Sequence, residues 1–312
     1  MSPLLALAAL LTTAAPAQPA PGHPLALPVQ LVEGRFVLTP RLQGGRVVRL
    51  YSDSGGGRTM LTPELVGEAR LRVEHADAGS DALPLTAWPA WAPGASIPPP
   101  ARPAMVRAAP PLEPNLDGFL AQDWFGGRTW TFDYPGKRLL LRAGGDVPRG
   151  HRVPFHLPRP GPDSLAFGRI TIEVDGKPLD VLFDTGATTE LTPAALAAVG
   201  GGRAAHRAAS FMKAAIFDGW RTAHPRWTVV EKAEVGTGAD MIRVPAVVVA
   251  GQKVGPVWFT RRPNPAFDSF MSSMMDAPVV GALGGSGLRY FRITVDYAQG
   301  VAVFERGPSV AR

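Results

Sequence analysis

The chain has 312 residues, with 35 Gly, 33 Pro, no Cys and a formal net charge of +6 from 32 Lys and Arg against 26 Asp and Glu. A hydrophobic fraction of 46% excludes a wholly disordered chain, and the absence of Cys excludes disulfides, thiolate zinc sites and a cysteine nucleophile. The Arg residues are scattered rather than clustered, which favours a solvated basic surface over a nucleic-acid site.

The first segment is typical of an export signal. Residues 4–11 are an apolar run, and Ala15-Pro16-Ala17 has the small residues of a cleavage site. No Lys or Arg precedes the run, which departs from the usual pattern, and a disordered apolar tail is the alternative. Neither this run nor any later segment reaches about 18 apolar residues, so we expect no stable membrane span. A signal peptide over residues 1–17 predicts a periplasmic or secreted protein.

The elements that follow are a β-type stretch and a short helix. Residues 45–52 begin at a Gly turn and lead to Asp53-Ser54-Gly55. Leu61-Thr62-Pro63 then predicts a helix over residues 64–67, with Thr as the N-cap and Pro at the first helical position.

A proline-rich segment occupies the middle of the first half. Residues 84–114 contain ten prolines, which argues against a regular central strand or helix and predicts an extended loop that could act as a lid. Trp88 and Trp91 lie in this loop and are weak candidates for substrate contact. Aromatic anchors that pack the loop onto its own lobe are the alternative.

The second half repeats these elements in the same order. The first half ends with Phe119-Leu120-Ala121 and a hairpin from residue 130, and the boundary lies in the Gly-, Pro- and Arg-rich residues 144–160. The matching elements in the second half are the β-type stretch 176–183, Asp184-Thr185-Gly186, the helix 194–199 after Leu191-Thr192-Pro193, Val279-Val280-Gly281, and a closing hairpin from residue 293. Four matches in one order indicate an internal duplication. We predict an all-β, two-lobed fold with short helices, with lobes over residues 24–145 and 150–308.

The two Asp-Ser/Thr-Gly elements resemble the active-site loops of aspartic proteases of the retroviral and pepsin types. Residues 183–189 are similar to the retroviral-type (retropepsin-like) signature, and residues 52–56 match it more loosely. Val279-Val280-Gly281 is similar to a second family element, whose Gly is replaced by Ala121 in the first half. The resemblance covers nearly all of the chain after the predicted signal and implies an acid-protease fold. Because both units are in one chain, it also implies an active monomer.

The resemblance implies that Asp53 and Asp184 form a catalytic pair, with Ser54, Gly55, Thr185 and Gly186 as the supporting loop residues. Two carboxylates a few Å apart share one proton, so one can act as a base and the other as an acid. The Gly permits a tight loop, and the family's Ser/Thr hydroxyls join the two loops. An isolated Asp-Ser-Gly is more often a simple turn, which is the alternative for Asp53.

These features predict an aspartic endopeptidase that hydrolyses a peptide or protein substrate, without a cofactor or metal. The alternatives are a non-catalytic peptide-binding module with the same fold and a structural β protein. The chain has neither the Gly-x-Ser-x-Gly motif of serine hydrolases nor the His-Glu-x-x-His motif of metalloproteases. Carboxyl groups of Asp53 and Asp184 within hydrogen-bonding distance would favour the enzyme, and carboxyl groups that point apart would favour the binding module.

Overall fold

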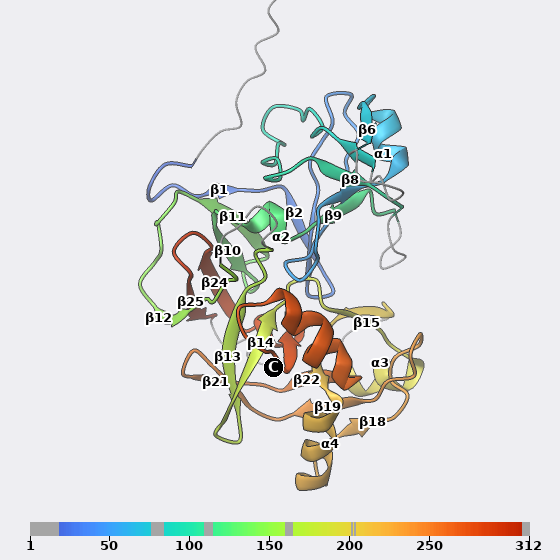
Figure 1. Cartoon of the computed structure of the whole chain (residues 1–312), viewed down its shortest axis with the longest axis vertical. Helices are drawn as coiled ribbons and strands as arrows, with labels where there is room; N and C mark the ends of the chain where they lie inside the picture. The colour runs from blue at the N-terminus through green and yellow to red at the C-terminus, as the bar shows by residue number, and fades with distance from the viewer. Residues whose placement is uncertain are drawn as a thin grey trace, which may run out of the picture.

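The computed structural model describes residues 19–75, 84–108, 115–159, 165–200, 202 and 204–307. The predicted signal peptide lies outside this range. The described chain is all-β with short helices, as predicted, and has an upper lobe, a lower lobe and a sheet at one side to which both halves contribute (Figure 1). Of the helices in this part of the chain, none combines the length and the apolar character that crossing a membrane requires.

Lobe 1, the upper lobe in Figure 1, contains an eight-stranded sheet within the described residues, in the order β2-β3-β4-β9-β5-β8-β7-β6. In chain order, the strands are β2 (Val29–Val32), β3 (Arg35–Leu38), β4 (Leu50–Ser52), β5 (Met60–Leu61), β6 (Val73–His75), β7 (Pro84–Thr86), β8 (Ala104–Val106) and β9 (Gly118–Leu120). β3 and β4 are fully buried, and β4 ends one residue before Asp53.

Lobe 2 contains a nine-stranded sheet in the described range, in the order β18-β19-β22-β17-β23-β14-β13-β20-β21, and a separate pair, β15 and β16. In chain order, the strands are β13 (Arg169–Val174), β14 (Lys177–Phe183), β15 (Thr188–Glu190), β16 (His206–Ala208), β17 (Ser210–Lys213), β18 (Val229–Val230), β19 (Met241–Val244), β20 (Val247–Val249), β21 (Gln252–Val254), β22 (Val257–Arg262) and β23 (Gly281–Leu283). β14 ends directly before Asp184.

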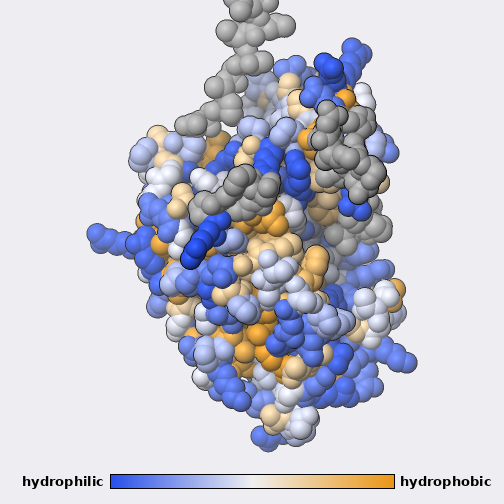
Figure 2. Space-filling model, in the orientation of Figure 1, coloured by the Kyte–Doolittle hydropathy of each residue, from blue (hydrophilic) through white to orange (hydrophobic). Residues whose placement is uncertain are grey.

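The helices are short and lie between strands. They are α1 (Pro63–Glu68), α2 (Gln122–Phe125), α3 (Pro193–Val199), α4 (Ala214–Ala223), α5 (Gly285–Leu288), a π-helical turn (Ala266–Met271) and a 3-10 turn (Ser272–Met274). The two predicted helices are confirmed as α1 and α3, and the hydroxyls of Thr62 and Thr192 accept hydrogen bonds from backbone N–H groups in the first turns. Figure 2 shows hydrophilic residues over much of the surface in this view, with hydrophobic residues gathered toward the middle and on part of the lower lobe.

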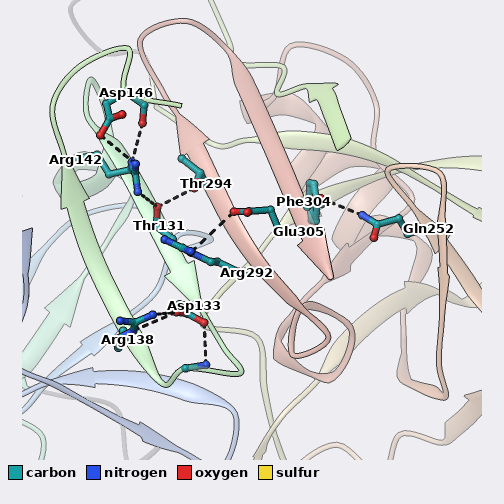
Figure 3. Close-up of polar contacts among 11 residues, drawn as sticks. Thr131, Asp133, Arg138, Arg142, Asp146, Gln252, Arg292, Thr294, Phe304 and Glu305 are labelled. Atoms are coloured by element: carbon teal, nitrogen blue, oxygen red, sulfur yellow. Dashed lines mark hydrogen bonds and ion pairs between the residues drawn. The ribbon is translucent and has the colours of Figure 1, made fainter. Parts of the chain in front are cut away.

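A six-stranded sheet joins the two halves, in the order β1-β11-β10-β24-β25-β12. Its strands are β1 (Leu25–Ala26), β10 (Thr129–Asp133), β11 (Arg138–Arg142), β12 (His151–Pro154), β24 (Phe291–Asp296) and β25 (Val301–Arg306). The central pair, β10 and β24, is antiparallel with Thr131 opposite Thr294, and their hydroxyl oxygens are 2.8 Å apart (Figure 3). Part of the predicted boundary, residues 144–160, therefore forms a strand, β12, of this shared sheet.

The central strands of the two lobe sheets have matching directions. In lobe 1, β4 is parallel to β9, β9 is antiparallel to β5, and β5 is parallel to β8. In lobe 2, β14, β23, β17 and β22 repeat this pattern. β5 and β17 occupy the same place in the two sheets but different places along the chain. β5 precedes helix α1, whereas β17 follows helix α3.

Strand register corrects one part of the predicted repeat. Ser52 pairs with Leu120, and Phe183 pairs with Leu283, so the residue beside Asp184 that corresponds to Ala121 is Gly284. The predicted match of Ala121 with Gly281 is wrong by three residues. The backbone agrees with the new pairing: φ and ψ are −96° and −173° at Ala121 and −110° and −164° at Gly284, and a short helix follows each.

The proline-rich segment is less irregular than predicted. β7 and β8 lie inside the order of the lobe 1 sheet, each with a neighbour on both sides. β7 begins with Pro84, a position where a strand tolerates the missing N–H. Residues 87–103 between the two strands are irregular apart from an isolated bridge at Trp91, as expected for an extended loop, and residues 109–114 lie outside the described range.

We predict that Gly284→Ala destabilises the fold far more than Ala121→Gly. The backbone at Gly284 is extended, so the reason for Gly is space: a Cβ there would lie 2.1 Å from the Ala209 carbonyl oxygen and 2.6 Å from the Ala187 Cβ. We expect Gly284→Ala to cost about 1–3 kcal/mol of unfolding free energy or more, and Ala121→Gly about 1 kcal/mol. Urea denaturation of both variants measures this, and equal stabilities would contradict the new pairing.

Candidate functional site

The Asp53 loop begins where β4 ends. The Asp53 N–H donates to the carbonyl oxygen of Leu120 at 2.8 Å, which attaches the loop to the neighbouring strand β9. The loop then turns back, so that the Gly55 N–H donates to Asp53 Oδ1 at 3.1 Å. The carboxyl group is thereby fixed by its own loop at the carboxyl end of a buried strand.

The Asp184 loop has the same construction in lobe 2. The Asp184 N–H donates to the carbonyl oxygen of Leu283 at 3.1 Å, and the Gly186 N–H donates to Asp184 Oδ1 at 3.0 Å. Leu283 on β23 stands in the place that Leu120 occupies on β9. The two loops thus present their carboxyl groups in equivalent ways.

The two carboxyl groups meet because each loop places a glycine against the other loop's aspartate. A Cβ on Gly55 would lie 2.6 Å from Asp184 Cγ, and one on Gly186 would lie 2.3 Å from Asp53 Cγ. Any larger residue at either position would push the carboxyl groups apart. The Asp53 and Asp184 carboxyl groups interact directly, and this interaction raises the pKa of Asp53 and acts to lower that of Asp184.

Ser54 and Thr185 lock the two loops together. The Ser54 hydroxyl donates to the Phe183 carbonyl oxygen at 2.8 Å and accepts from the Thr185 N–H at 3.0 Å. In return, the Thr185 hydroxyl accepts from the Ser54 N–H at 3.1 Å and donates to the Ser52 carbonyl oxygen at 3.4 Å. All four bonds are buried and join lobe 1 to lobe 2. Each predicted supporting residue therefore lies beside the pair.

Burial raises the pKa of both carboxyl groups. The pKa of Asp184 is raised to about 6, and that of Asp53 well above its usual range, where the neighbouring Asp184 charge adds to the effect of burial. Backbone N–H groups of Gly186 and Ala187 act against this increase at Asp184, and those of Gly55 and Gly56 at Asp53. The pair therefore holds a proton into mildly acidic solution.

Asp53 is the more exposed member of the pair. Asp53, Gly55 and Gly56 are half-buried, and Gly57 is exposed, whereas Asp184 is 9% exposed. A cavity of about 250 Å³ lies further along lobe 2, and the turn between β2 and β3 of lobe 1 contributes to its lining. The lining includes Thr189 and Leu191 but none of residues 53–56 and 184–187.

Trp88 and Trp91 pack on lobe 1. Their rings meet edge to face at 5.8 Å between centroids, and both are half-buried against the core of the protein. The Trp88 indole N–H donates to the Ile97 carbonyl oxygen at 3.4 Å, and Trp91 forms a β-bridge with Leu42. This is the arrangement expected of loop anchors, and substrate contact by either ring stays a prediction.

Two residues at the site were missed from the sequence. Gly284 was missed because only strand pairing reveals its position beside Asp184. Tyr51 lies two residues before Asp53 on β4, and its hydroxyl donates to the Gly186 carbonyl oxygen at 2.6 Å. The signal for Tyr51 was available, since residues i and i+2 of a strand point to the same face.

Comparison with known proteins does not assign the chain to a family. No family model and no curated protein matches the sequence. Among solved structures, the chain is similar to conglutin gamma, described as a unique basic 7S globulin from lupine seeds, with 10% identity and a TM-score of 0.45 over 91% of this chain and 95% of that one. At that identity and TM-score the likeness carries no argument about function.

We predict that Ser54→Ala and Thr185→Ala are each strongly destabilising and that their effects are not additive. Each change leaves a buried N–H of the opposite loop without its acceptor, which costs about 1–3 kcal/mol. Because both residues hold the same pair of loops, the double variant should lose less than the sum of the two. Denaturant unfolding measures this, with Ser273→Ala as a control in an exposed turn. Strict additivity would show that the four bonds do not act together.

We predict that wild-type stability falls between about pH 4 and pH 7 and that Asp184→Asn removes much of this fall. A carboxyl group whose pKa is raised in the folded state binds more protons when folded, so raising the pH through that pKa destabilises the protein. At pH 8, Asp184→Asn should be the more stable by on the order of 1–3 kcal/mol.

The matched control for this experiment is Asp218→Asn. The Arg261 guanidinium lowers the pKa of Asp218, so that carboxyl group contributes stability above its usual pKa, and this contribution disappears as the pH falls. Its removal should flatten the acidic side of the stability curve instead. Parallel pH–stability curves for wild type and Asp184→Asn would contradict the prediction.

Proposed function

We propose that the chain is an aspartic endopeptidase that hydrolyses peptide bonds with Asp53 and Asp184. The observation that carries this proposal is the close approach of the two carboxyl groups at the junction of two equivalently built loops, where each loop's glycine packs against the other loop's aspartate. The similarity of residues 52–56 and 183–189 to the active-site loops of aspartic proteases adds to it. The arrangement differs from that expected for a binding module, in which the carboxyl groups would point apart.

The proposed reaction needs one proton on the pair. The charged carboxylate accepts a proton from a water molecule, whose oxygen attacks the carbonyl carbon of the substrate. The protonated carboxyl group donates its proton to the carbonyl oxygen, and the tetrahedral intermediate has no covalent bond to the protein. Transfer of a proton to the amide nitrogen then allows the carbon–nitrogen bond to break. The raised pKa of both groups supports this proposal, because the singly protonated state persists where hydrolysis must occur.

The proposal includes a peptide or protein substrate and an active monomer. An extended peptide binds through main-chain hydrogen bonds and pockets for its side chains, which suits a site built at strand ends. Both Asp loops belong to one chain, so the site needs no second copy. A periplasmic or secreted location stays a prediction from residues 1–17.

We predict that Asp53→Asn and Asp184→Asn each lower kcat/KM on a cleaved peptide by at least about 100-fold. Two residues that share one proton act as a unit, so the double variant should be little worse than either single variant. A peptide-library cleavage assay on the full chain identifies the substrate, and cleavage should peak in mildly acidic solution.

Asp218→Asn is the surface control for this experiment and should retain full activity. Full activity in Asp53→Asn would remove lobe 1 from the mechanism. Binding of library peptides without cleavage by wild type would favour the peptide-binding module instead.

A further inference from the structure

Tyr51 connects the two lobes directly at the Asp pair. Its ring is fully buried on β4 and packs against Phe119, with 5.2 Å between ring centroids. The hydroxyl leaves lobe 1 and reaches two groups of the Asp184 loop: the Gly186 carbonyl oxygen at 2.6 Å, and the Thr188 hydroxyl. Two residues of the Asp184 loop are therefore held by a side chain from the strand that carries Asp53.

Both hydroxyls reach the same acceptor. A phenol has one proton, and the carbonyl oxygen of Gly186 can only accept, so Tyr51 donates to Gly186. The Thr188 hydroxyl donates to the same carbonyl oxygen at 2.9 Å and lies against the Tyr51 hydroxyl. Burial raises the pKa of Tyr51 above its usual value, so the phenol keeps its proton over the working pH range.

Tyr51 holds the residue whose N–H hydrogen-bonds the Asp184 carboxyl group. Gly186 accepts from the Tyr51 hydroxyl through its carbonyl oxygen at 2.6 Å and donates through its N–H to Asp184 Oδ1 at 3.0 Å. A hydrogen bond to the charged form of a carboxyl group favours that form. A side chain that fixes Gly186 therefore supports the charge on Asp184.

The Asp53 loop has no tyrosine at the matching place. Its equivalent glycine is Gly55, whose N–H donates to Asp53 Oδ1 at 3.1 Å. The residue two positions before Asp184 is Leu182, a buried apolar side chain that packs in a cluster with Phe167 and Phe267. The two loops therefore have the same backbone and differ in the side chain that holds this glycine from the opposite lobe.

We propose that Tyr51 is a positioning residue that makes the pair unequal: by fixing Gly186, whose N–H donates to Asp184 Oδ1, it stabilises the charge on Asp184 and leaves the shared proton on Asp53. Asp184 is then the base toward water, and Asp53 is the acid. The assignment of these two roles rests on the proposed function, whereas the effect of Tyr51 on the charge of Asp184 does not.

The other titratable and charged groups around Asp184 are compatible with this assignment. Asp53 faces it directly and, when protonated, donates to it. Tyr134, at the end of β10, is a buried neutral phenol near Asp184. Arg35, on β3, has its guanidinium carbon 5.9 Å from the centre of the Tyr51 ring. The pKa of Asp184, at about 6, is raised by burial, and the Gly186 N–H acts against that increase.

The test is the titration of the two carboxyl groups by carbon-13 NMR on the full chain labelled at aspartate. In Tyr51→Phe, the pKa of the group that ionises first should rise by about 0.3–1, equal to a two- to tenfold loss of charged Asp184 at that pH. Thr188→Val should shift it in the same direction by a smaller amount, since it removes one of the two hydroxyls that donate to the Gly186 carbonyl oxygen but keeps the phenol. This second variant keeps the proposal testable if Tyr51→Phe does not fold.

Tyr134→Phe is the matched control, because in the described part of the chain its buried hydroxyl has no hydrogen-bond partner. It should leave the titration unchanged. On a cleaved peptide, Tyr51→Phe should move the acidic limb of kcat/KM upward by the same amount as the NMR titration. An unchanged titration in Tyr51→Phe, or an equal shift in Tyr134→Phe, would overturn the proposal. A wild type that cleaves no peptide would refute the proposed function, while the titration would still decide the role of Tyr51.

Discussion

Two carboxyl groups in contact repel each other when both are charged, and each loses hydration when it is removed from water. A structure that holds them together must therefore stabilise the contact with other interactions. The compensation here is the set of buried hydrogen bonds that Ser54 and Thr185 make between the loops. Each of the two residues uses its hydroxyl as donor and acceptor toward the opposite lobe. The loops cannot separate without breaking these four buried hydrogen bonds, and this constraint keeps Asp53 and Asp184 together.

The shared six-stranded sheet packs against the strand that leads to Asp184. Its central strands place Thr131 opposite Thr294, so equivalent residues of the two halves face each other. Phe132 of this sheet packs edge to face on Phe183, the residue before Asp184, with 5.6 Å between ring centroids. Phe155 contacts the same ring from the start of the second half, also at 5.6 Å. A shift of lobe 2 relative to the sheet would therefore disturb the packing of Phe132 and Phe155 on Phe183, the residue next to Asp184.

The sequence predicted the features that depend on local chemistry. The Thr-Pro pairs gave the starts of both helices, because a Thr cap and a Pro at the first position act within one turn. The Asp-Ser/Thr-Gly loops were found in the same way. Features that depend on pairing between distant strands were not predicted. Gly281 rather than Gly284 was matched with Ala121, because only the register of β14 with β23 distinguishes the two glycines. The different positions of β5 and β17 along the chain likewise give no local signal in the sequence.

A single chain can do what two identical subunits cannot, which is to place different residues beside its two aspartates. Equivalent positions in the two halves hold Tyr51 and Leu182, and Ala121 and Gly284. In a symmetric dimer the hydroxyl of a tyrosine at the first position would reach both loops equally, and neither carboxyl group would be favoured as the charged one. With one tyrosine, the hydrogen bond to Gly186 acts on the Asp184 side alone. The irregularities of the first half thus give Asp53 and Asp184 different surroundings, while the backbone of the two loops remains the same.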